Sequence, residues 1–357
     1  MNSRVLIMAG GTGGHVFPAL AVADELRSRD VDVFWMGTEK GIEAKLVPAS
    51  GYPLTYISVQ GLRGNGLLGW LLAPFKLIKA VAEAVSAIKQ IKPDVVLGLG
   101  GFASGPGGVA ARLLAKPVVI HEQNAIPGLT NRLLSRVAQR VLQGFPRSFT
   151  AARHAEWVGN PVRITIESIT KPKTRLADRA GPVRVLVLGG SLGAKSLNTV
   201  LPEAFTSVKT AVEIKHQCGV RHLDVCQENY KKAATNAEVT AFIDDMANAY
   251  AWADLVICRA GALTVAEVSA TGVAALFVPY PYAVDDHQTH NASALVSAGA
   301  AKLIQESDLT VASFAAEISE LVSDRSVLVD MAIRARGQAK TGTAQYVADI
   351  CLEVAHG

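Results

Sequence analysis

One short sequence unit occurs twice in this 357-residue chain, and it limits the possible folds more than any other feature. In each copy an uninterrupted apolar run leads straight into a glycine-rich turn: RVLIMAGGTGG at residues 4–14 and RVLVLGGSLGA at residues 184–194. A second pair of matching segments follows at residues 93–101 and 253–261. Strands without polar interruptions are typical of a parallel sheet that helices cover on both faces.

Segments with helical periodicity separate these strands. We expect helices at residues 18–28, 74–91, 129–140, 196–208, 264–271 and 291–298. Within residues 74–91, we expect Ile78, Val81, Val85 and Ile88 to form the face that packs on the core. Strands that alternate with helices indicate the α/β class, and the repeat predicts two Rossmann-like, doubly wound parallel-sheet domains that face each other across a cleft.

The domain boundaries are predicted from the repeat and from one irregular segment. Residues 164–182 contain prolines and little apolar periodicity, which is typical of a linker. We therefore expect an N-terminal domain at residues 1–161 and a C-terminal domain at residues 162–342. A last helix at residues 343–357 follows the second domain in sequence, and the pattern does not say on which domain it packs.

Composition excludes several classes of protein. Half of the residues are hydrophobic and only 18% are charged, which argues against a disordered chain. The four cysteines form no CxxC pair, so neither a zinc ribbon nor a disulfide framework is expected, and free thiols fit a reducing cytosol. No signal-peptide pattern and no apolar stretch of about 18 residues occurs, so we expect no membrane span.

The net charge of +4 is concentrated in one place. Residues 63–92 contain five basic residues and one acidic residue, so this segment alone carries a charge of +4. It also contains more apolar side chains than one helix face can bury. Apolar residues beside lysine and arginine suit the surface of an anionic membrane, and no nucleic-acid partner is expected. The apolar side chains concerned are Leu67, Leu68, Trp70, Leu71, Leu72 and Phe75.

The glycine turns indicate phosphate binding, because amide groups at the start of a helix attract anions. The nicotinamide fingerprint GxGxxG fails at Val16, and the acidic residue expected at the end of the second strand is missing. The P-loop pattern GxxxxGK[ST] of nucleoside-triphosphate-binding proteins also fails, because Ala194 stands where it requires glycine. Two domains with such turns therefore suggest a nucleotide on one side and a second substrate on the other.

Several further motifs then identify a known family. In order and in combination they closely resemble the MurG-type transferases, which add N-acetylglucosamine to the undecaprenyl-pyrophosphoryl-MurNAc-pentapeptide precursor of peptidoglycan. The resemblance covers nearly the whole chain. The motifs are residues 10–18 (GGTGGHVFP), 121–124 (HEQN), 159–163 (GNPVR), 190–191 (GS), 242–246 (FIDDM), 259–267 (RAGALTVAE) and 285–288 (DDHQ).

The resemblance implies the GT-B fold and an activity. The expected reaction is inverting transfer of GlcNAc from UDP-GlcNAc to the MurNAc 4-hydroxyl, which converts lipid I to lipid II. The C-terminal domain would bind the donor. The N-terminal domain would bind the acceptor and the membrane, as a peripheral protein on the cytoplasmic face of the inner membrane.

The resemblance also implies roles for donor-binding residues. Glu267 would bind the ribose hydroxyls, although Thr264 to Glu267 also fits a simple capping box. The uracil would meet the backbone of Ile243, a GlcNAc hydroxyl would meet Gln288, and Arg163 would contact phosphate. The backbone amides that would hold the diphosphate are those of Ala262, Leu263, Thr264, Val265 and Ala266.

Other residues are assigned from their position in the glycine turns. Ser191 is either a turn residue or a phosphate contact, and its place in the repeated turn favours phosphate. Thr12, Gly13 and Gly14 would line the same cleft, with Asn124 contacting the donor sugar. His15 either caps a helix or helps to deprotonate the acceptor hydroxyl, and histidine is the commonest general base near neutral pH.

His287 and His290 beside Asp285 and Asp286 could form a metal site by spacing, but such spacing is common and no further ligands are evident. No acidic DxD motif is present to hold a metal on a sugar diphosphate, so we expect neither metal nor cofactor. Two alternatives remain at this stage: a UDP-sugar enzyme of similar fold with a soluble substrate, and a membrane-associated nucleotide-binding scaffold without catalytic activity.

Overall fold

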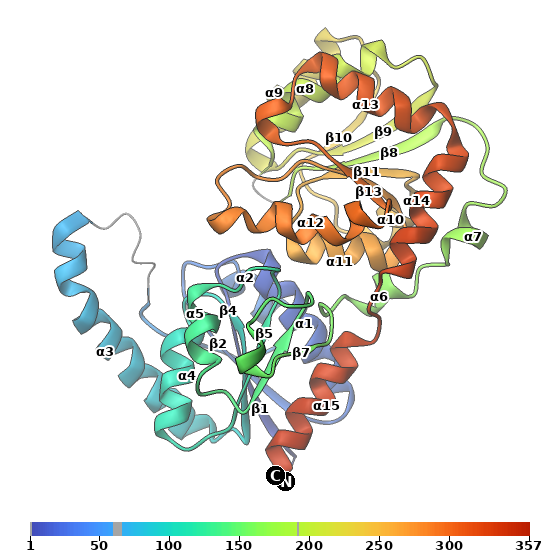
Figure 1. Ribbon diagram of the computed structural model, residues 1–357. Coiled ribbons are helices and arrows are strands. Elements are labelled where there is room, and N and C mark those ends of the chain that lie inside the picture. The colour runs from blue at the N-terminus through green and yellow to red at the C-terminus, as the bar shows by residue number, and fades with distance from the viewer. Residues whose placement is uncertain (1, 60–65, 191–192) are drawn as a thin grey trace. The chain divides into compact units, whose positions relative to one another are not determined.

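The computed structural model describes residues 2–59, 66–190 and 193–357 (Figure 1). The chain divides into two compact units. The first comprises Met1–Arg163 together with Lys340–Gly357, and the second comprises Ile164–Ala339. Each unit has its own parallel sheet and its own apolar core.

The first unit contains a seven-stranded sheet in the order β3-β2-β1-β4-β5-β6-β7, in which every neighbouring pair is parallel. The strands are uninterrupted apolar runs because helices cover both faces of the sheet. Their bounds are β1 (Arg4–Ala9), β2 (Asp32–Gly37), β3 (Leu54–Tyr56), β4 (Val95–Gly100), β5 (Val118–Glu122), β6 (Arg140–Gln143) and β7 (Glu156–Trp157).

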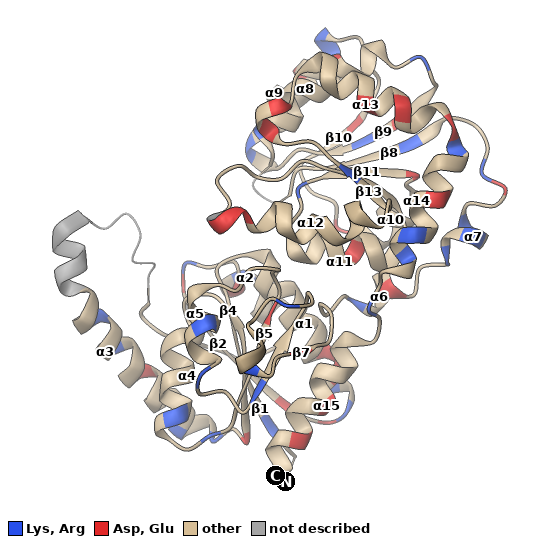
Figure 2. Cartoon of the chain, in the orientation of Figure 1, with Lys and Arg blue, Asp and Glu red and all other residues tan. Residues whose placement is uncertain are grey.

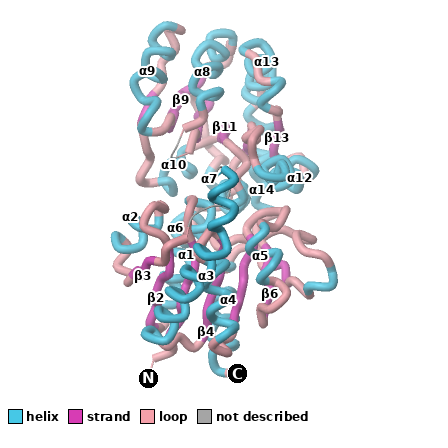
Figure 3. The backbone as a smooth tube through the Cα atoms, turned by 90° about the vertical axis from the view of Figure 1, so that its left-hand side faces the viewer, coloured by secondary structure: helices cyan, strands magenta, loops and turns pink. Residues whose placement is uncertain are grey.

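Alternate residues of β1 belong to different cores, which shows that both faces are covered. Val5 and Ile7 pack with helices α1 and α15, whereas Leu6 and Met8 pack with helices α3, α4 and α5. Figure 3 shows α3 and α4 in front of the strands of this sheet. The helices are α1 (Gly13–Ser28), α2 (Glu43–Ala49), α3 (Gly66–Ile91), α4 (Ser104–Leu113), α5 (Leu129–Leu134) and α15 (Thr343–His356).

The second unit repeats this plan with six parallel strands in the order β10-β9-β8-β11-β12-β13. The strands are β8 (Val183–Leu188), β9 (Val212–Gln217), β10 (Glu238–Thr240), β11 (Leu255–Cys258), β12 (Ala274–Phe277) and β13 (Ala301–Leu303). The helices are α6 (Ile164–Glu167), α7 (Pro172–Arg175), α8 (Lys195–Ala204), α9 (Leu223–Lys232), α10 (Met246–Trp252), α11 (Ala262–Thr271), α12 (His287–Ser297), α13 (Val311–Ser323) and α14 (Arg325–Gly337).

The repeated segments form the central strand pair of each sheet, β1 with β4 and β8 with β11. Even a side-chain contact is duplicated. The Asp94 carboxylate accepts from the amide of Arg4 at 2.8 Å, and the Asp254 carboxylate accepts from the amide of Arg184 at 3.0 Å. In each sheet the strand order reverses at this pair, which is where open α/β sheets form ligand crevices.

Helix α15 packs on the first unit. Val347, Ile350, Cys351 and Val354 are buried in the same core as α1 and one face of the seven-stranded sheet. Thr343 starts the helix and donates its hydroxyl hydrogen to the carbonyl of Val158 at 2.9 Å. The chain therefore passes from the first unit to the second and back again.

The expected linker at residues 164–182 is wrong. This segment begins the second unit and holds helices α6 and α7. Arg175 donates to the carbonyls of Thr271 and Gly272, and Arg179 forms an ion pair of 2.9 Å with the buried Asp254. These arginines hold the segment on the second unit. Because it is held by hydrogen bonds and an ion pair, its sequence shows little apolar periodicity.

The predicted core face of α3 is also partly wrong. Ile88 is buried and Val81 and Val85 are half-buried, but Ile78 is 67% exposed. Between Ile78 and Ile88, two residues of the helix are fully buried, and both are alanines, Ala80 and Ala84. Small side chains there allow α4 to approach α3 closely. Across the described ranges, no helix is both long and apolar enough to cross a membrane.

Candidate active site

A hollow of about 240 Å³ opens in the first unit beside the carboxyl ends of the central strands. The glycine turn after β1 and the glycine turn after β4 form one side of it, and the residues after β5 form the other. Of the predicted site residues, the structure brings Thr12, His15 and Asn124 together here. The lining residues are Gly10, Gly11, Thr12, His15, Gly100, Gly101, Phe102, Glu122, Asn124, Gly128, Leu129, Thr130 and Asn131.

His15 lies in the first turn of α1 with its ring over the β4 turn. Its Nδ1 is 3.2 Å from the carbonyl oxygen of Gly10 and 3.4 Å from Oγ1 of Thr12. A Cβ atom on Gly100 would lie 3.0 Å from Cδ2 of this ring, so a glycine there makes room for the imidazole. Gly13 and Gly14 begin the helix behind this ring and are not among the lining residues.

The first glycine turn does not offer all its amides to an anion. The amide of Gly11 donates to Oε2 of Glu43 at 2.9 Å, and the amides of His15 and Val16 both donate to the carbonyl of Thr12. The prediction of a turn with free amides is therefore wrong for Gly11. This amide is instead bound by the buried carboxylate of Glu43.

A second buried carboxylate arranges the opposite side of the hollow. Oε1 of Glu122 accepts from the backbone amide and the side-chain amide of Asn124, at 3.0 and 3.1 Å. Its Oε2 accepts from the amide of Gly128 at 3.1 Å and from the side chain of Asn131 at 3.0 Å. Because four donors surround it, Glu122 stays paired while it fixes the position of Asn124.

His121, in the same motif, is held in the neutral form. Its Nε2 donates to the carbonyl of Gly159 at 2.8 Å, and its Nδ1 accepts from the side chain of Gln123 at 3.1 Å. Burial lowers the pKa of His121 to about 4. This histidine therefore holds β5 against the end of the first unit, and His15 is the histidine that lines the hollow.

In the second unit, helix α11 starts at the carboxyl end of β11. Its N-cap is Gly261, and the amide of Val265 donates to the carbonyl of Gly261 at 2.9 Å. Only the amides of the first turn, Ala262, Leu263 and Thr264, lack an acceptor inside the helix. The structure thus narrows the predicted diphosphate cradle: the amides of Val265 and Ala266 belong to the helix ladder.

The capping-box interpretation of Thr264 and Glu267 is wrong, since Thr264 lies inside the helix and Gly261 caps it without a side-chain bond. Glu267 is buried, at 7% exposed, and its Oε2 accepts from the hydroxyl of Tyr250 at 3.0 Å. Burial of a carboxylate is costly unless a hydrogen-bond donor such as this hydroxyl pairs with it. Glu267 is therefore oriented by α10, not by the start of its own helix.

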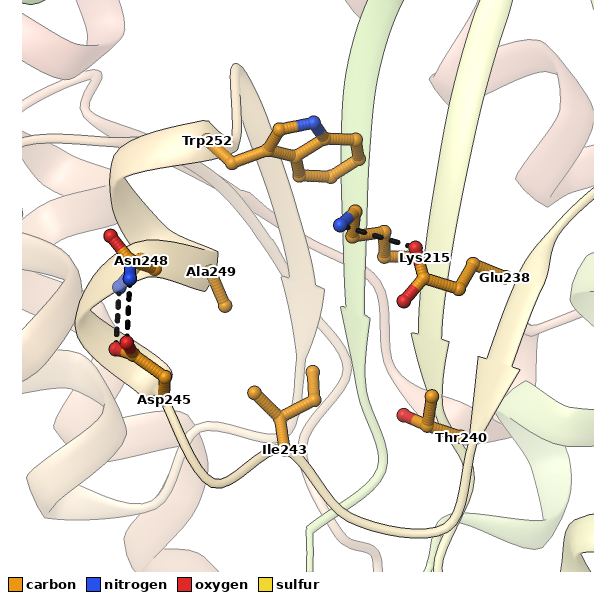
Figure 4. A pocket seen from close by; sticks show the side chains of 8 residues that line it. All are labelled: Lys215, Glu238, Thr240, Ile243, Asp245, Asn248, Ala249 and Trp252. Carbon is orange, nitrogen blue, oxygen red and sulfur yellow. Dashed lines mark hydrogen bonds and ion pairs between the residues drawn. The ribbon is translucent and has the colours of Figure 1, made fainter.

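A second hollow, of about 290 Å³, lies along α10 and contains Ile243 (Figure 4). Ile243 and Thr240 stand at one end, and Trp252 stands at the other. Nζ of Lys215 lies 3.1 Å from Oε2 of Glu238 and 4.9 Å from the centre of the Trp252 ring. Asp245 accepts from the backbone amide of Asn248 at 2.9 Å and so caps α10.

Gln288 lies in the first turn of α12. Its side-chain oxygen accepts a hydrogen bond from the amide of Tyr280 at 2.9 Å. The side-chain NH₂ group therefore points away from Tyr280 and can donate to another group.

Arg259, after β11, donates to the carbonyls of Val278 and Pro279 and forms an ion pair with Glu306. Arg259 therefore ties the ends of β11 and β12 together.

The structure describes one of the two other predicted phosphate contacts, Arg163. Arg163 is the last residue of the first unit, and its guanidinium lies 5.5 Å from the centre of the Phe17 ring. Ser191 lies outside the described residues. Beside it, Gly193 has a positive φ of 78°, and a Cβ atom there would overlap the carbonyl oxygen of Cys218. The turn after β8 thus requires glycine for steric reasons.

Sequence reasoning missed the residues that hold the site in place. Glu122 and Arg259 stand inside motifs that were recognised, but neither was given a role. Glu43 was missed entirely; it lies six residues after β2 ends at Gly37 and two residues after Gly41. An acidic residue that closely follows two glycines at the end of a parallel strand is the signal that could have found it.

Comparison with known proteins agrees with this architecture. Residues 5–143 match the glycosyltransferase family 28 N-terminal domain, and residues 184–347 match the glycosyltransferase family 28 C-terminal domain. The calicheamicin glycosyltransferase CalG4 shares 17% identity with a TM-score of 0.69, over 99% of this chain and 98% of that chain. That likeness shows the fold, in which two doubly wound parallel-sheet domains make up one GT-B chain.

Similarity to relatives of one kind extends over the full length. The UDP-N-acetylglucosamine–N-acetylmuramyl-(pentapeptide) pyrophosphoryl-undecaprenol N-acetylglucosamine transferase of Nitrosococcus oceani is 55% identical, with 100% of both chains covered. That of Aeromonas hydrophila is 53% identical, over 100% of this chain and 98% of the relative. The crystal structure of Acinetobacter baumannii MurG is 45% identical with a TM-score of 0.86, over 98% of this chain and 99% of that one. The chain therefore belongs to the family of UDP-N-acetylglucosamine–N-acetylmuramyl-(pentapeptide) pyrophosphoryl-undecaprenol N-acetylglucosamine transferases.

Proposed function

We propose that this protein transfers N-acetylglucosamine from UDP-GlcNAc to the MurNAc 4-hydroxyl of undecaprenyl-pyrophosphoryl-MurNAc-pentapeptide, converting lipid I to lipid II. The observation that carries the proposal is full-length identity of 55% to a relative of that name. The duplicated sheets support it, because each unit presents a glycine turn at its strand switch point, one for each substrate.

The second unit binds the donor in this proposal. The amides of Ala262, Leu263 and Thr264 receive the diphosphate at the start of α11, where the helix dipole favours negative charge. Glu267, oriented by Tyr250, accepts from the ribose hydroxyls. The backbone of Ile243 meets the uracil, and the NH₂ group of Gln288 donates to a GlcNAc hydroxyl. Arg163 and Ser191 contact phosphate.

The first unit binds the acceptor and supplies the base. His15 takes the proton from the acceptor hydroxyl, whose oxygen attacks the anomeric carbon with inversion while UDP departs with the bonding electron pair. Asn124, held by Glu122, contacts the transferred sugar beside Thr12. Gly13 and Gly14 let the backbone at the start of α1 approach the substrate. Amides and Arg163 balance the charge that develops on the diphosphate.

The decisive experiment measures UDP release from UDP-GlcNAc with three acceptors: a polyprenyl-pyrophosphoryl-MurNAc-pentapeptide, the same compound without the MurNAc sugar, and none. Release only with the first acceptor supports the transfer. Release with no acceptor would indicate a hydrolase. UDP-GlcNAc binding without release under any of the three conditions would indicate a scaffold and would contradict the proposal.

We further propose that the first unit docks on an anionic membrane through its α3, α4 and α5 side. Large apolar side chains there are more than half exposed, whereas apolar residues on a helix that packs are usually buried. The blue bands of Figure 2 on these helices mark the basic residues that accompany them. The exposed apolar side chains are Phe75, Leu77, Ile78, Leu113, Leu129 and Leu133.

The charge on this side is mostly positive. Residues 73–140 contain nine lysines and arginines but only three acids, and one of these, Glu122, is buried within the hollow. Exposed Lys76, Lys79, Arg112 and Arg132 are interleaved with the apolar side chains. Each basic residue near an anionic surface contributes about 1 kcal/mol of attraction. The predicted contacts at residues 67–72 lie in α3, and their side chains are outside the described residues.

Vesicle flotation tests the docking surface. The wild-type protein should float with vesicles that contain phosphatidylglycerol and should remain behind with neutral ones. Leu113→Asp with Leu129→Asp should abolish flotation. Val220→Asp with Val225→Asp makes the same changes at two exposed valines of the second unit and should leave it intact. Equal flotation of both double variants would contradict this surface.

A further inference from the structure

We propose that Glu43 is a positioning residue for His15 and acts through the single peptide group that joins Gly10 to Gly11. The inference rests on the proposed role of His15 as the base. It adds a residue from α2 to the machinery and states what that residue does. Glu43 itself touches no substrate.

The carboxylate of Glu43 is completely buried, at 0% exposed, and has three donors. Its Oε1 accepts from the amide of Thr38 at 2.9 Å and from the hydroxyl of Thr38 at 2.7 Å. Its Oε2 accepts from the amide of Gly11 at 2.9 Å. One oxygen thus attaches the side chain to the end of β2, and the other holds the glycine turn after β1.

The peptide group held by Glu43 is the same group that meets His15. The N–H of this group belongs to Gly11, and its carbonyl oxygen belongs to Gly10, which lies 3.2 Å from Nδ1 of His15. A peptide group is planar, so fixing its N–H also fixes the direction of its carbonyl. Glu43 and His15 therefore lie at the two ends of one rigid unit.

The carbonyl of Gly10 favours the tautomer of His15 that carries the proton on Nδ1. A carbonyl oxygen only accepts hydrogen bonds, so the 3.2 Å contact forms when Nδ1 donates, whereas the Thr12 hydroxyl, 3.4 Å away, can either donate or accept. In the neutral ring Nε2 then carries the lone pair, which is the form that a base needs. A turn that rotated away would remove this preference and allow the other tautomer.

The surroundings of Glu43 are built around its side chain. A Cβ atom on Gly10 or on Gly41 would overlap the carboxylate, and one on Gly37 would lie 2.7 Å from Cγ of Glu43. Three glycines, one after β1 and two at and just after the end of β2, thus leave the space that this side chain fills. A residue needed only to end β2 would be satisfied by Thr38 and would not have to reach the turn that carries His15.

Glu43→Gln tests the inference with almost no change in volume. The glutamine oxygen keeps the two Thr38 donors, and its NH₂ group faces the N–H of Gly11, where two donors oppose each other. We expect kcat to fall about 10-fold or more, because the base would no longer be held in its productive orientation. The KM for UDP-GlcNAc should change less than kcat, because the residues proposed to hold its uracil and ribose lie in the second unit.

Thr38→Val is the matched control. It removes one donor to the same buried carboxylate but leaves the Gly11 contact in place, so kcat should stay near that of the wild type. An equal fall in kcat for Thr38→Val and Glu43→Gln would mean that any disturbance of this carboxylate slows turnover, and would overturn the positioning role.

A double-mutant cycle with His15→Ala separates this inference from the proposed function. Glu43→Gln should have no further effect on kcat once His15 is absent, because its effect passes through that ring. The same loss in both backgrounds would overturn the role of Glu43 while leaving His15 as the base. Near-normal turnover of His15→Ala would overturn the base itself, and this inference with it.

Nitrogen-15 spectra of histidine in the wild-type protein provide a test that does not depend on activity measurements. The neutral ring of His15 should show a protonated Nδ1 and an unprotonated Nε2. Assignment to His15 comes from the signal that disappears in His15→Gln. A proton on Nε2 in the neutral ring would contradict the inference directly.

Discussion

The hydroxyl of Tyr250 donates to Oε2 of Glu267 at 3.0 Å, and both side chains are buried. This contact joins α10, beside the hollow that contains Ile243, to α11, whose first turn offers three amides. This hydrogen bond therefore links the helix beside the proposed uracil contact to the helix that carries the proposed ribose and diphosphate contacts.

Tyr250→Phe should weaken UDP binding and destabilise the protein. The carboxylate of Glu267 loses a donor, and a hydrogen bond to a charged group contributes about 1.5–3 kcal/mol. We expect the dissociation constant for UDP to rise roughly 3- to 10-fold, measured by calorimetry, since about 1 kcal/mol of lost orientation has that effect. The control is Tyr52→Phe, which removes a 2.6 Å hydrogen bond to Asp24 in the first unit and should leave UDP binding unchanged. Equal loss of affinity in both variants would indicate a general effect of destabilisation.

Gly101→Ala should reduce turnover through the turn that carries His15. Gly101 has a φ of +86°, and a Cβ atom there would overlap the carbonyl oxygen of Gly10. Gly181→Ala is the control, because its φ is +81° but no atom lies within 4 Å of the added Cβ. Both variants should lose about 1–3 kcal/mol of stability from backbone strain. Only Gly101→Ala should also lower kcat, and a normal kcat would show that the turn tolerates displacement.

His121 should make stability depend on pH. Burial lowers the pKa of His121 to about 4, whereas an unfolded histidine titrates near 6.5. Its stabilising contribution is therefore complete above about pH 6.5 and is lost as pH falls toward 4, since the unfolded state then binds the proton. The loss approaches roughly 3 kcal/mol. Urea unfolding at several pH values measures it, and His121→Gln should flatten the slope between pH 6.5 and 4.5. An unchanged slope would assign the dependence to other groups.

Arg179→Met should destabilise the second unit strongly. The Arg179 and Asp254 side chains are 10% and 2% exposed, and removing one partner of a buried ion pair costs about 3–5 kcal/mol. Arg27→Met removes a pair with Asp24 whose side chains are about half exposed, and should cost less than about 1 kcal/mol. Urea unfolding should separate the two variants. Similar losses would show that Asp254 is satisfied by its other partners.

Local sequence pattern was sufficient for the elements that depend on burial. The central strands were recognised because parallel strands covered on both faces are apolar throughout, as Val5 to Ala9 and Val185 to Leu188 are. Their repetition gave the two sheets. Motif order then gave the family, which full-length identity to curated relatives confirmed.

What failed depends on contacts that local pattern does not contain. Helical spacing grouped Ile78 with Ile88, but the side of α3 that packs is decided by contact with α4, and there the buried positions are Ala80 and Ala84. The pattern Thr264 to Glu267 fits a capping box, yet Tyr250 takes the carboxylate from 17 residues away. Glu43 reaches Gly11 from 32 residues away. Such pairings follow from the packed fold and leave little trace in neighbouring residues.

The return of the chain to the first unit has a consequence for how the protein acquires its structure. The core beside α1 is completed by Val347, Ile350 and Val354, which follow every residue of the second unit along the chain. During synthesis all residues of the second unit, 164–339, therefore emerge before the first unit has its last helix. The unit that is translated first is therefore completed last, because the core beside α1 needs a helix that is made after the whole second unit.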